Sequence, residues 1–282
     1  MSNSRRIGAH LSTSGGVDKA VVRAKKIGAN SLQVFSGSPR MWRRTSLDKI
    51  DVITVKQAQE KLDVTPIFTH ALYLINLASD NPELVEKSVT ALKHDLNFDT
   101  HIGGAGVIVH LGSHQGRGFA AAQKQVAQQL KAILTDTSED SHLLVENAAA
   151  HNGKVGGRLE EVAWLLKEVG SPRLGWCFDT CHGFAAGYTL IGEGEDSALA
   201  MMEKLGLISS LRCLHVNDSK DPLGSGRDRH ANIGDGQIPT ADLKEFLNDP
   251  RLAKLPIITE APGLDGTGPD EANIRRLKSL VK

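Results

Sequence analysis

The residues with the clearest chemical potential lie between positions 211 and 236, in the stretch LRCLHVNDSKDPLGSGRDRHANIGDG. The apolar run 211–216 predicts a buried strand, and a charged, glycine-rich loop follows it. Imidazole and carboxylate groups that could hold a divalent metal gather there: His215, Asp218, Asp228 and His230. Asp228 and His230 are two positions apart, so their side chains point the same way in an extended segment. Taken alone, this stretch fits a metal site and a solvated polar loop equally well.

Composition narrows the class of protein. A chain of 282 residues has the length of an α/β barrel, and its 33 basic and 33 acidic residues cancel. A net charge of zero gives no global attraction to nucleic acid, although it leaves room for a local basic face. Cys177, Cys181 and Cys213 form no CxxC pair or disulfide framework, so we expect buried thiols and a cytoplasmic protein. The start MSNSRRIGAH does not read as a signal peptide, and no apolar run reaches about 18 residues, so we expect no membrane contact.

Short apolar runs alternate with helical patterns along the whole chain. Eight runs predict strands: 6–11, 31–37, 65–71, 106–112, 142–148, 174–183, 211–216 and 256–262. A helical pattern follows each: 15–28, 50–62, 82–98, 120–134, 158–170, 196–205, 240–249 and 271–280. Strands that alternate with helices form parallel βαβ units, and eight units in this length predict a single-domain TIM (β/α)8 barrel.

A TIM barrel carries its active site at the carboxyl ends of its strands. Nine histidines and carboxylates fall at these ends or in the loops after them: His70, His110, Glu146, Asp179, His182, His215, Asp228, His230 and Glu260. One such histidine is usually a hydrogen-bonded structural residue. Nine ionisable groups buried together are costly unless something compensates them.

Metal ions are the simplest compensation for this set. One zinc needs about four ligands, so the set can serve two or three ions, especially if a carboxylate bridges. Mixed imidazole and carboxylate ligands without a thiolate suit Zn²⁺ or Mn²⁺. Closely spaced ions can clamp both the attacking and the leaving oxygen of a phosphoryl displacement. The residues therefore indicate a multinuclear metal phosphoesterase.

Four long segments, 7–16, 70–79, 178–188 and 215–236, together resemble the endonuclease IV family. These are zinc-dependent apurinic/apyrimidinic endonucleases of base excision repair. The resemblance implies three zinc ions, with Mn²⁺ as an alternative, and assigns nine ligands. The implied sets are His70, His110 and Glu146 for the first ion; Glu146, Asp179, His215 and Glu260 for the second; and His182, Asp228 and His230 for the third. Glu146 would bridge two ions, and Asp218 matches no ligand.

The resemblance also implies the reaction and the substrate. Family members hydrolyse the phosphodiester 5′ of an abasic site in double-stranded DNA by a metal-bound hydroxide, leaving a 3′-hydroxyl and a 5′-deoxyribose phosphate. Glu146 and Glu260 would be catalytic, Glu260 by orienting or deprotonating the water. Arg40, Tyr73 and Leu74 match side chains that family members push into the DNA stack. A basic rim would add phosphate contacts, from Arg40, Arg43, Arg44, Lys220, Arg227 and Arg229. A monomer is the default expectation.

Some positions depart from the family pattern, namely Leu72, Leu111, Ser36–Ser38 and the segment after Glu146. None of them removes a ligand, so the expected metal site is unaffected. They leave open which substrates the protein accepts. A sugar isomerase or epimerase of the xylose isomerase-like barrels is the main alternative, because such enzymes share the fold and a cluster like that of the second ion. A DNA-binding protein without activity is another. An isomerase has no need of the five ligands outside the second set, which are His70, His110, His182, Asp228 and His230. The presence of all nine ligands argues against a protein that has lost its activity.

Overall fold

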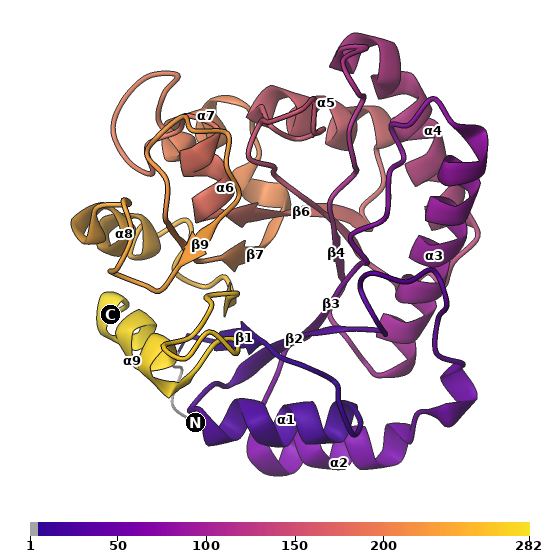
Figure 1. Cartoon of the computed structure of the whole chain (residues 1–282), viewed down its shortest axis with the longest axis vertical. Coiled ribbons are helices and arrows are strands. Elements are labelled where there is room, and N and C mark those ends of the chain that lie inside the picture. The colour runs from indigo at the N-terminus through magenta and orange to yellow at the C-terminus, as the bar shows by residue number, and fades with distance from the viewer. Residues whose placement is uncertain (1–4) are drawn as a thin grey trace.

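The computed structural model describes residues 5–282, so part of the N-terminal stretch considered for a signal peptide lies outside it. Within these residues, eight parallel strands close into a barrel in the order β1-β10-β7-β6-β5-β4-β3-β2. Helices surround this barrel, as Figure 1 shows. The predicted single-domain TIM barrel is therefore confirmed. The barrel strands are β1 (Ile7–His10), β2 (Ser31–Phe35), β3 (Ile67–His70), β4 (Val107–Val109), β5 (Leu143–Glu146), β6 (Leu174–Asp179), β7 (Leu211–His215) and β10 (Ile257–Thr259).

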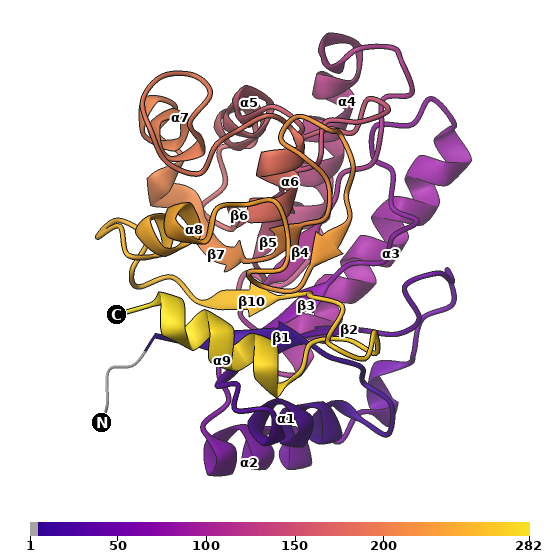
Figure 2. The ribbon, with the colours of Figure 1, turned by 60° about the vertical axis from the view of Figure 1, so that its left-hand side comes forward.

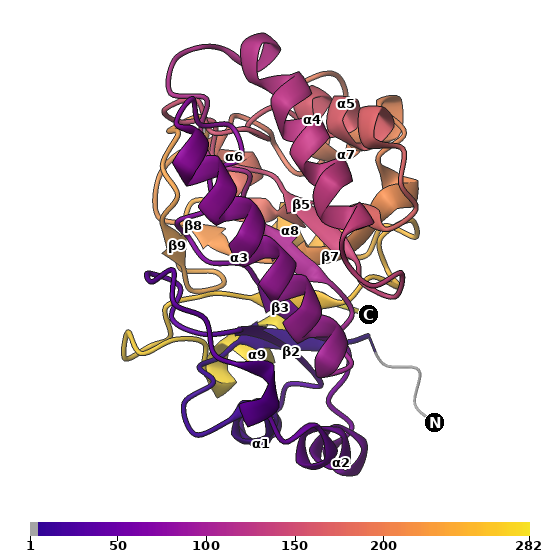
Figure 3. The same cartoon turned by 90° about the vertical axis from the view of Figure 1, so that its right-hand side faces the viewer.

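Helices follow the strands as the apolar spacing predicts. They are α1 (Val17–Lys26), α2 (Val52–Leu62), α3 (Pro82–His101), α4 (Phe119–Thr135), α5 (Leu159–Val169), α6 (Thr180–Ala185), α7 (Ala198–Lys204), α8 (Thr240–Leu247) and α9 (Glu271–Leu280), with short 3₁₀ turns η1 (Leu47–Lys49) and η2 (Ile208–Ser210). The last strand, β10, pairs with β1 and closes the barrel, and α9 lies beside them (Figure 2). Seen from the right-hand side of Figure 1, α3 crosses the barrel wall between α1 and α2 below and α4 and α5 above (Figure 3). No helix among residues 5–282 is long and apolar enough to cross a membrane.

Two local features differ from the sequence prediction. The strand in the run 174–183 ends at Asp179, as expected, but α6 begins directly after it, because the Asp179 side chain accepts a hydrogen bond from the backbone N–H of His182 at 2.8 Å. His182 therefore lies on the first turn of a helix. The loop after β7 is not irregular throughout, since β8 (Asp218–Ser219) and β9 (His230–Ala231) pair as an antiparallel ribbon.

An apolar layer crosses the barrel interior below its mouth. Its members form one cluster of buried side chains, namely Phe68, Ile108, Leu144, Cys177, Cys213 and Ile258. Each lies two positions before a predicted ligand on the same strand or at its end. Side chains alternate along a strand, so each ligand faces the barrel axis directly above this layer. The three cysteines are buried and free, as predicted.

Candidate metal centre

The first predicted ligand set converges at the ends of β3, β4 and β5. His70 Nε2 and His110 Nε2 each lie 3.2 Å from Glu146 Oε2. One potential ligand atom from each of the three residues falls within 4.8 Å of the others. His70 Nδ1 lies 2.7 Å from the carbonyl oxygen of Ala71, so the backbone engages this nitrogen and leaves Nε2 facing Glu146.

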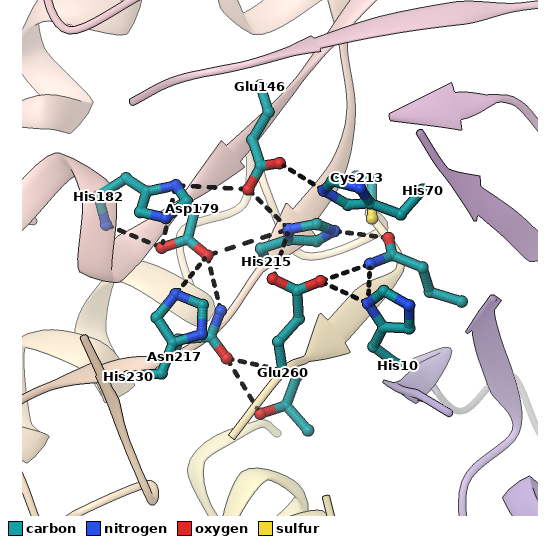
Figure 4. A network of polar contacts seen from close by, with 12 residues as sticks. His10, His70, Glu146, Asp179, His182, Cys213, His215, Asn217, His230 and Glu260 are labelled. Carbon is teal, nitrogen blue, oxygen red and sulfur yellow. Dashed lines mark hydrogen bonds and ion pairs between the residues drawn. The ribbon is translucent and has the colours of Figure 1, made fainter. Parts of the chain in front are cut away.

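The second set meets on the other side of Glu146. Glu146 Oε1 lies 2.9 Å from His215 Nδ1, which is also 3.6 Å from Glu260 Oε2 and 3.9 Å from Asp179 Oδ2. Ligand atoms of these four residues all lie within 4.8 Å of one another. Glu146 thus turns one carboxylate oxygen to each set, and Figure 4 shows it between His182, His215 and His70.

The third set forms where α6 and the β8–β9 ribbon approach. Asp228 Oδ1 lies 3.0 Å from His182 Nε2 and 3.4 Å from His230 Nε2. Asp179 also reaches this set, with Oδ2 3.8 Å from His230 Nε2. Ligand atoms of Asp179, His182 and His230 lie within 4.8 Å of one another. Sequence reasoning assigned Asp179 only to the second set, whereas the structure places it between the second and the third.

Asp218 organises the loop that carries Asp228 and His230. Its carboxylate accepts hydrogen bonds from the backbone N–H groups of Ser219, Gly234, Gly236 and Ile238, at 2.8 to 3.0 Å. A Cβ atom at position 236 would lie 2.3 Å from Asp218 Oδ1, so the turn requires glycine there. Asp218 therefore acts through the loop, as expected from its lack of a matching ligand role.

The buried carboxylates of the cluster need positive charge close by to compensate them. Burial alone would raise the pKa of Glu146, but His110 and His215 outweigh it and hold that pKa well below its usual range. Burial alone would lower the pKa of His215, but Glu146 and Glu260 outweigh it and raise the pKa to about 10. Glu146 is thus ionised, and a proton on His215 neutralises it when nothing else does. Divalent cations can replace such protons, because neutral imidazole and ionised carboxylate are the ligand forms.

The donor set fits divalent ions. Among residues 5–282, His182 Nε2 and His230 Nε2 are buried and form no hydrogen bond, although both face Asp228. A buried polar atom without a partner is rare and needs an explanation. An ion beside Asp228 would supply it. The nitrogen and oxygen donors match Zn²⁺ or Mn²⁺.

Four polar residues missed by sequence reasoning surround the ligands. Asn217 Nδ2 donates to Asp179 Oδ2 at 2.6 Å, and its Oδ1 accepts from the backbone N–H of Glu260 at 2.7 Å. Asn147 Oδ1 accepts from the backbone N–H of Asp179 at 2.6 Å. His10 and Gln33 contact Glu260 from β1 and β2. The sequence does contain a pattern that could have identified these four residues, because each is a polar residue within or just after an apolar strand run.

A fourth group of potential ligand atoms lies partly in the apolar layer. Ligand atoms of Cys177, Cys213 and His215 fall within 4.8 Å of one another. Burial raises the pKa of the Cys177 thiol well above its usual range, which favours the neutral thiol. We therefore assign these cysteines to the barrel core.

A cleft of about 1070 Å³ opens above the cluster. Arg40 and Tyr73 line it together with His70, His110 and Glu260. Arg40 is exposed, and the Tyr73 side chain is 58% exposed. The backbone N–H of Tyr73 donates to the carbonyl of Pro39 at 3.0 Å, which ties the two loops together.

Leu74, the third side chain matched to DNA insertion, sits differently. It is half-buried and packs against the hydrophobic core. It lines a neighbouring cavity beside Tyr73 rather than the cleft above the ligands.

The predicted basic rim is smaller than expected. Arg44 does not belong to it, because its guanidinium pairs with the buried carboxylate of Asp95 at 2.9 Å and is only 9% exposed. Arg229 is exposed but forms a two-fold hydrogen-bonded pair with Asp221, which removes much of its charge from the rim. Arg40, Arg43, Lys220 and Arg227 remain exposed, and of these Arg40 lines the cleft.

Comparison with known proteins shows similarity over almost the full length. Residues 21–280 match the family described as the xylose isomerase-like TIM barrel. The chain is 35% identical over 280 residues to a probable endonuclease 4 of Chloroflexus aurantiacus, with 98% of both chains covered. It is 37% identical over 278 residues to a probable endonuclease 4 of Methanoculleus marisnigri, again with 98% of both covered.

Solved structures agree with these relatives. The crystal structure of endonuclease IV from Thermus thermophilus superposes with a TM-score of 0.84 at 35% identity, covering 98% of each chain. A D-tagatose 3-epimerase-like protein superposes with a TM-score of 0.71 at 17% identity, with 97% of this chain and 96% of that chain covered. That second likeness concerns the fold alone.

Proposed function

The chain belongs to the endonuclease IV family of xylose isomerase-like TIM barrels, a family of DNA-cleaving hydrolases, and from this membership we propose that it incises DNA at abasic sites. The cleaved bond would be the phosphodiester 5′ to the lesion, and the products a 3′-hydroxyl and a 5′-deoxyribose phosphate.

One observation carries the proposal beyond family membership, namely that three ligand sets adjoin one another. Glu146 turns one oxygen to each of two sets, and Asp179 adjoins the second and the third. A barrel isomerase needs only the set around Glu146, Asp179, His215 and Glu260. Further ions beside that set would give a role to the other ligands, namely His70, His110, His182, Asp228 and His230.

We propose three ions, Zn²⁺ or Mn²⁺, held by the sets His70, His110 and Glu146; Glu146, Asp179, His215 and Glu260; and His182, Asp228 and His230. Bound ions would supply Lewis-acid activation of the attacking water and neutralise charge on the phosphodiester. The chain supplies their alignment, because six of the nine side chains lie at or next to the ends of barrel strands, His182 lies on α6 and His230 on β9. Asp228 lies in the loop that joins β8 and β9.

Glu260 is the residue we propose to orient or deprotonate the attacking water. Its Oε1 is engaged by His10 at 2.7 Å and by Gln33 at 2.6 Å, whereas Oε2 faces the cluster. Burial alone would raise the pKa of Glu260, but His215 and His10 outweigh it and keep the group ionised. An ionised Oε2 can accept a proton from water.

Arg40 and Tyr73 are the residues we propose to enter the DNA stack. An abasic nucleotide leaves a gap that a side chain can fill, and extruding a nucleotide costs least at a damaged position. The exposure of Tyr73 above the cleft supports this role, and its backbone bond to Pro39 couples it to the Arg40 loop. The half-buried Leu74 would enter the stack only if its loop moved.

The test is incision of a duplex with one tetrahydrofuran abasic analogue. The proposal expects a nick on the 5′ side of the analogue that leaves a 3′-hydroxyl, and no nick in an undamaged duplex of the same sequence. Glu260→Gln should bind the abasic duplex yet cleave it far more slowly. An intact duplex together with epimerisation of a ketose would instead establish the sugar isomerase alternative.

A further inference from the structure

Gln33 is a polar side chain inside the barrel with no part in the ligand sets. It lies on β2, and its residue is 0% exposed. A buried amide needs partners for its oxygen and its nitrogen. Gln33 Nε2 donates to Glu260 Oε1 at 2.6 Å and also lies 2.9 Å from His10 Nδ1. Its Oε1 accepts from His215 Nε2 at 2.7 Å.

The oxygen contact determines the protonation pattern of His215. An amide oxygen can only accept, so His215 must carry a hydrogen on Nε2 to make this bond. Nδ1 is then the nitrogen available as a ligand. It is also the nitrogen that faces the other ligands, with Glu146 Oε1 at 2.9 Å and Glu260 Oε2 at 3.6 Å.

The nitrogen contact determines the orientation of Glu260. Gln33 and His10 both engage Oε1, so the carboxylate cannot rotate freely, and Oε2 is left to face His215 Nδ1. One neutral amide therefore fixes which atom each of two ligands turns toward the set around Glu146.

We propose that Gln33 is a positioning residue that selects the ligating atoms of His215 and Glu260 and thereby tunes one ion of the three. The inference rests on the proposed function only in taking that set as a metal site. Hydrogen-bond partners behind a metal ligand commonly hold it in place, and their loss typically weakens metal binding about 10–100-fold.

The other ligand sets do not depend on Gln33. His70 Nδ1 contacts the Ala71 carbonyl at 2.7 Å, and His182 Nδ1 contacts the Asn147 carbonyl at 3.1 Å. Loss of the Gln33 amide should therefore weaken one ion selectively. A general loss of structure would weaken all three together.

The first experiment measures metal binding without DNA. Chelator-stripped wild type and Gln33→Met are titrated with Zn²⁺ against a competing chelator. We expect wild type to bind three ions and Gln33→Met to bind one of them about 10–100-fold more weakly. The matched control is Gln125→Met, because the Gln125 amide donates to the carbonyls of Leu77 and Ser79, outside the ligand sets. Gln125→Met should bind all three ions as wild type does.

A second variant separates the two halves of the amide. Gln33→Glu keeps an oxygen to accept from His215 but loses the donor to Glu260 and puts a second negative charge beside it. In Zn²⁺-loaded protein, where a ligating His215 is neutral, the ¹⁵N shifts of its ring should therefore show the wild-type tautomer in Gln33→Glu and lose it in Gln33→Met. Both variants should lose affinity for one ion.

The results separate this inference from the proposed function. Three ions bound with equal affinity in wild type and Gln33→Met would overturn the role of Gln33 and leave the metal centre standing. Equal weakening of all three ions, or a wild-type His215 tautomer in Gln33→Met, would also overturn it. A wild type that binds no ion would overturn both.

Discussion

The buried ion pair between Arg44 and Asp95 offers a sharp test of how the loop that carries Arg40 is held. The Asp95 side chain on α3 is 0% exposed, and the Arg44 guanidinium lies 2.9 Å from its Oδ1. Ser36 Oγ also donates to Oδ1 at 2.5 Å. Among the residues described, Asp95 Oδ2 has no hydrogen-bond partner. Arg44 therefore supplies the main compensation for a charge buried under the loop.

Replacing Arg44 by methionine leaves this carboxylate buried and unpaired. Removing one partner of a buried pair typically costs about 3–5 kcal/mol. We expect the lower part of that range, because the Ser36 hydrogen bond to Asp95 remains. The double variant Arg44→Met with Asp95→Asn should regain most of the loss, because neither charge remains. Urea unfolding followed by circular dichroism measures both free energies of unfolding.

The same substitution should weaken DNA binding, because segment 36–45 also carries Arg40. Fluorescence anisotropy with a cleavage-resistant abasic duplex measures this affinity. Arg251→Met is the matched control, since Arg251 pairs with Glu203 and Asp249 and is 36% exposed. It should cost no more than about 1 kcal/mol and leave DNA binding unchanged. An Arg44→Met variant as mildly affected as this control, or a double variant with no recovery, would refute the reasoning.

Three further predictions concern charge, exposure and metal. Burial raises the pKa of Asp99 from 3.8 to about 7, so the free energy of unfolding of wild type should fall as pH rises from about 4 through 7. Asp99→Asn should remove a penalty of up to about 4 kcal/mol. Urea unfolding should therefore show a larger gain in stability for this variant at about pH 8 than at about pH 5. Tyr73→Ala should change the free energy of unfolding by less than about 0.5 kcal/mol, because the side chain is 58% exposed, yet weaken abasic-duplex binding about 10–100-fold in anisotropy. Dialysis against a chelator should lower the melting temperature in calorimetry, because buried Glu146 and Asp179 lose their compensating charge, and Zn²⁺ should restore it.

For each of these three predictions, one outcome would contradict the physical reason given. An Asp99→Asn gain that does not depend on pH would mean that Asp99 is ionised throughout. Wild-type affinity for abasic DNA in Tyr73→Ala would exclude an inserting role. A melting temperature unchanged by the chelator would indicate that ions add nothing to the fold.

The sequence predicted the barrel because eight apolar runs alternate with helical patterns, and it predicted the gathering of the ligands because the carboxyl ends of barrel strands meet at one face. Each ligand on a barrel strand lies two positions after a buried apolar residue, as Glu146 follows Leu144 and His215 follows Cys213. Such a pattern is local and can be found along the chain.

Features that depend on long-range packing were missed. Arg44 reads as a rim cation beside Arg40 and Arg43, and its partner Asp95 is 51 positions away on α3. Gln33 reads as one polar residue in an apolar run, and its role depends on how β2 faces His215, 182 positions away. The helix α6 directly after Asp179 was also missed, because a single capping hydrogen bond between the Asp179 side chain and the backbone N–H of His182 begins it.

The most direct test of the central claim is a crystal structure, with anomalous scattering, of protein purified without chelator. We predict three metal peaks, one on each side of the Glu146 carboxylate and a third among His182, Asp228 and His230. A single peak confined to the set with His215 and Glu260, or no peak at all, would contradict the account.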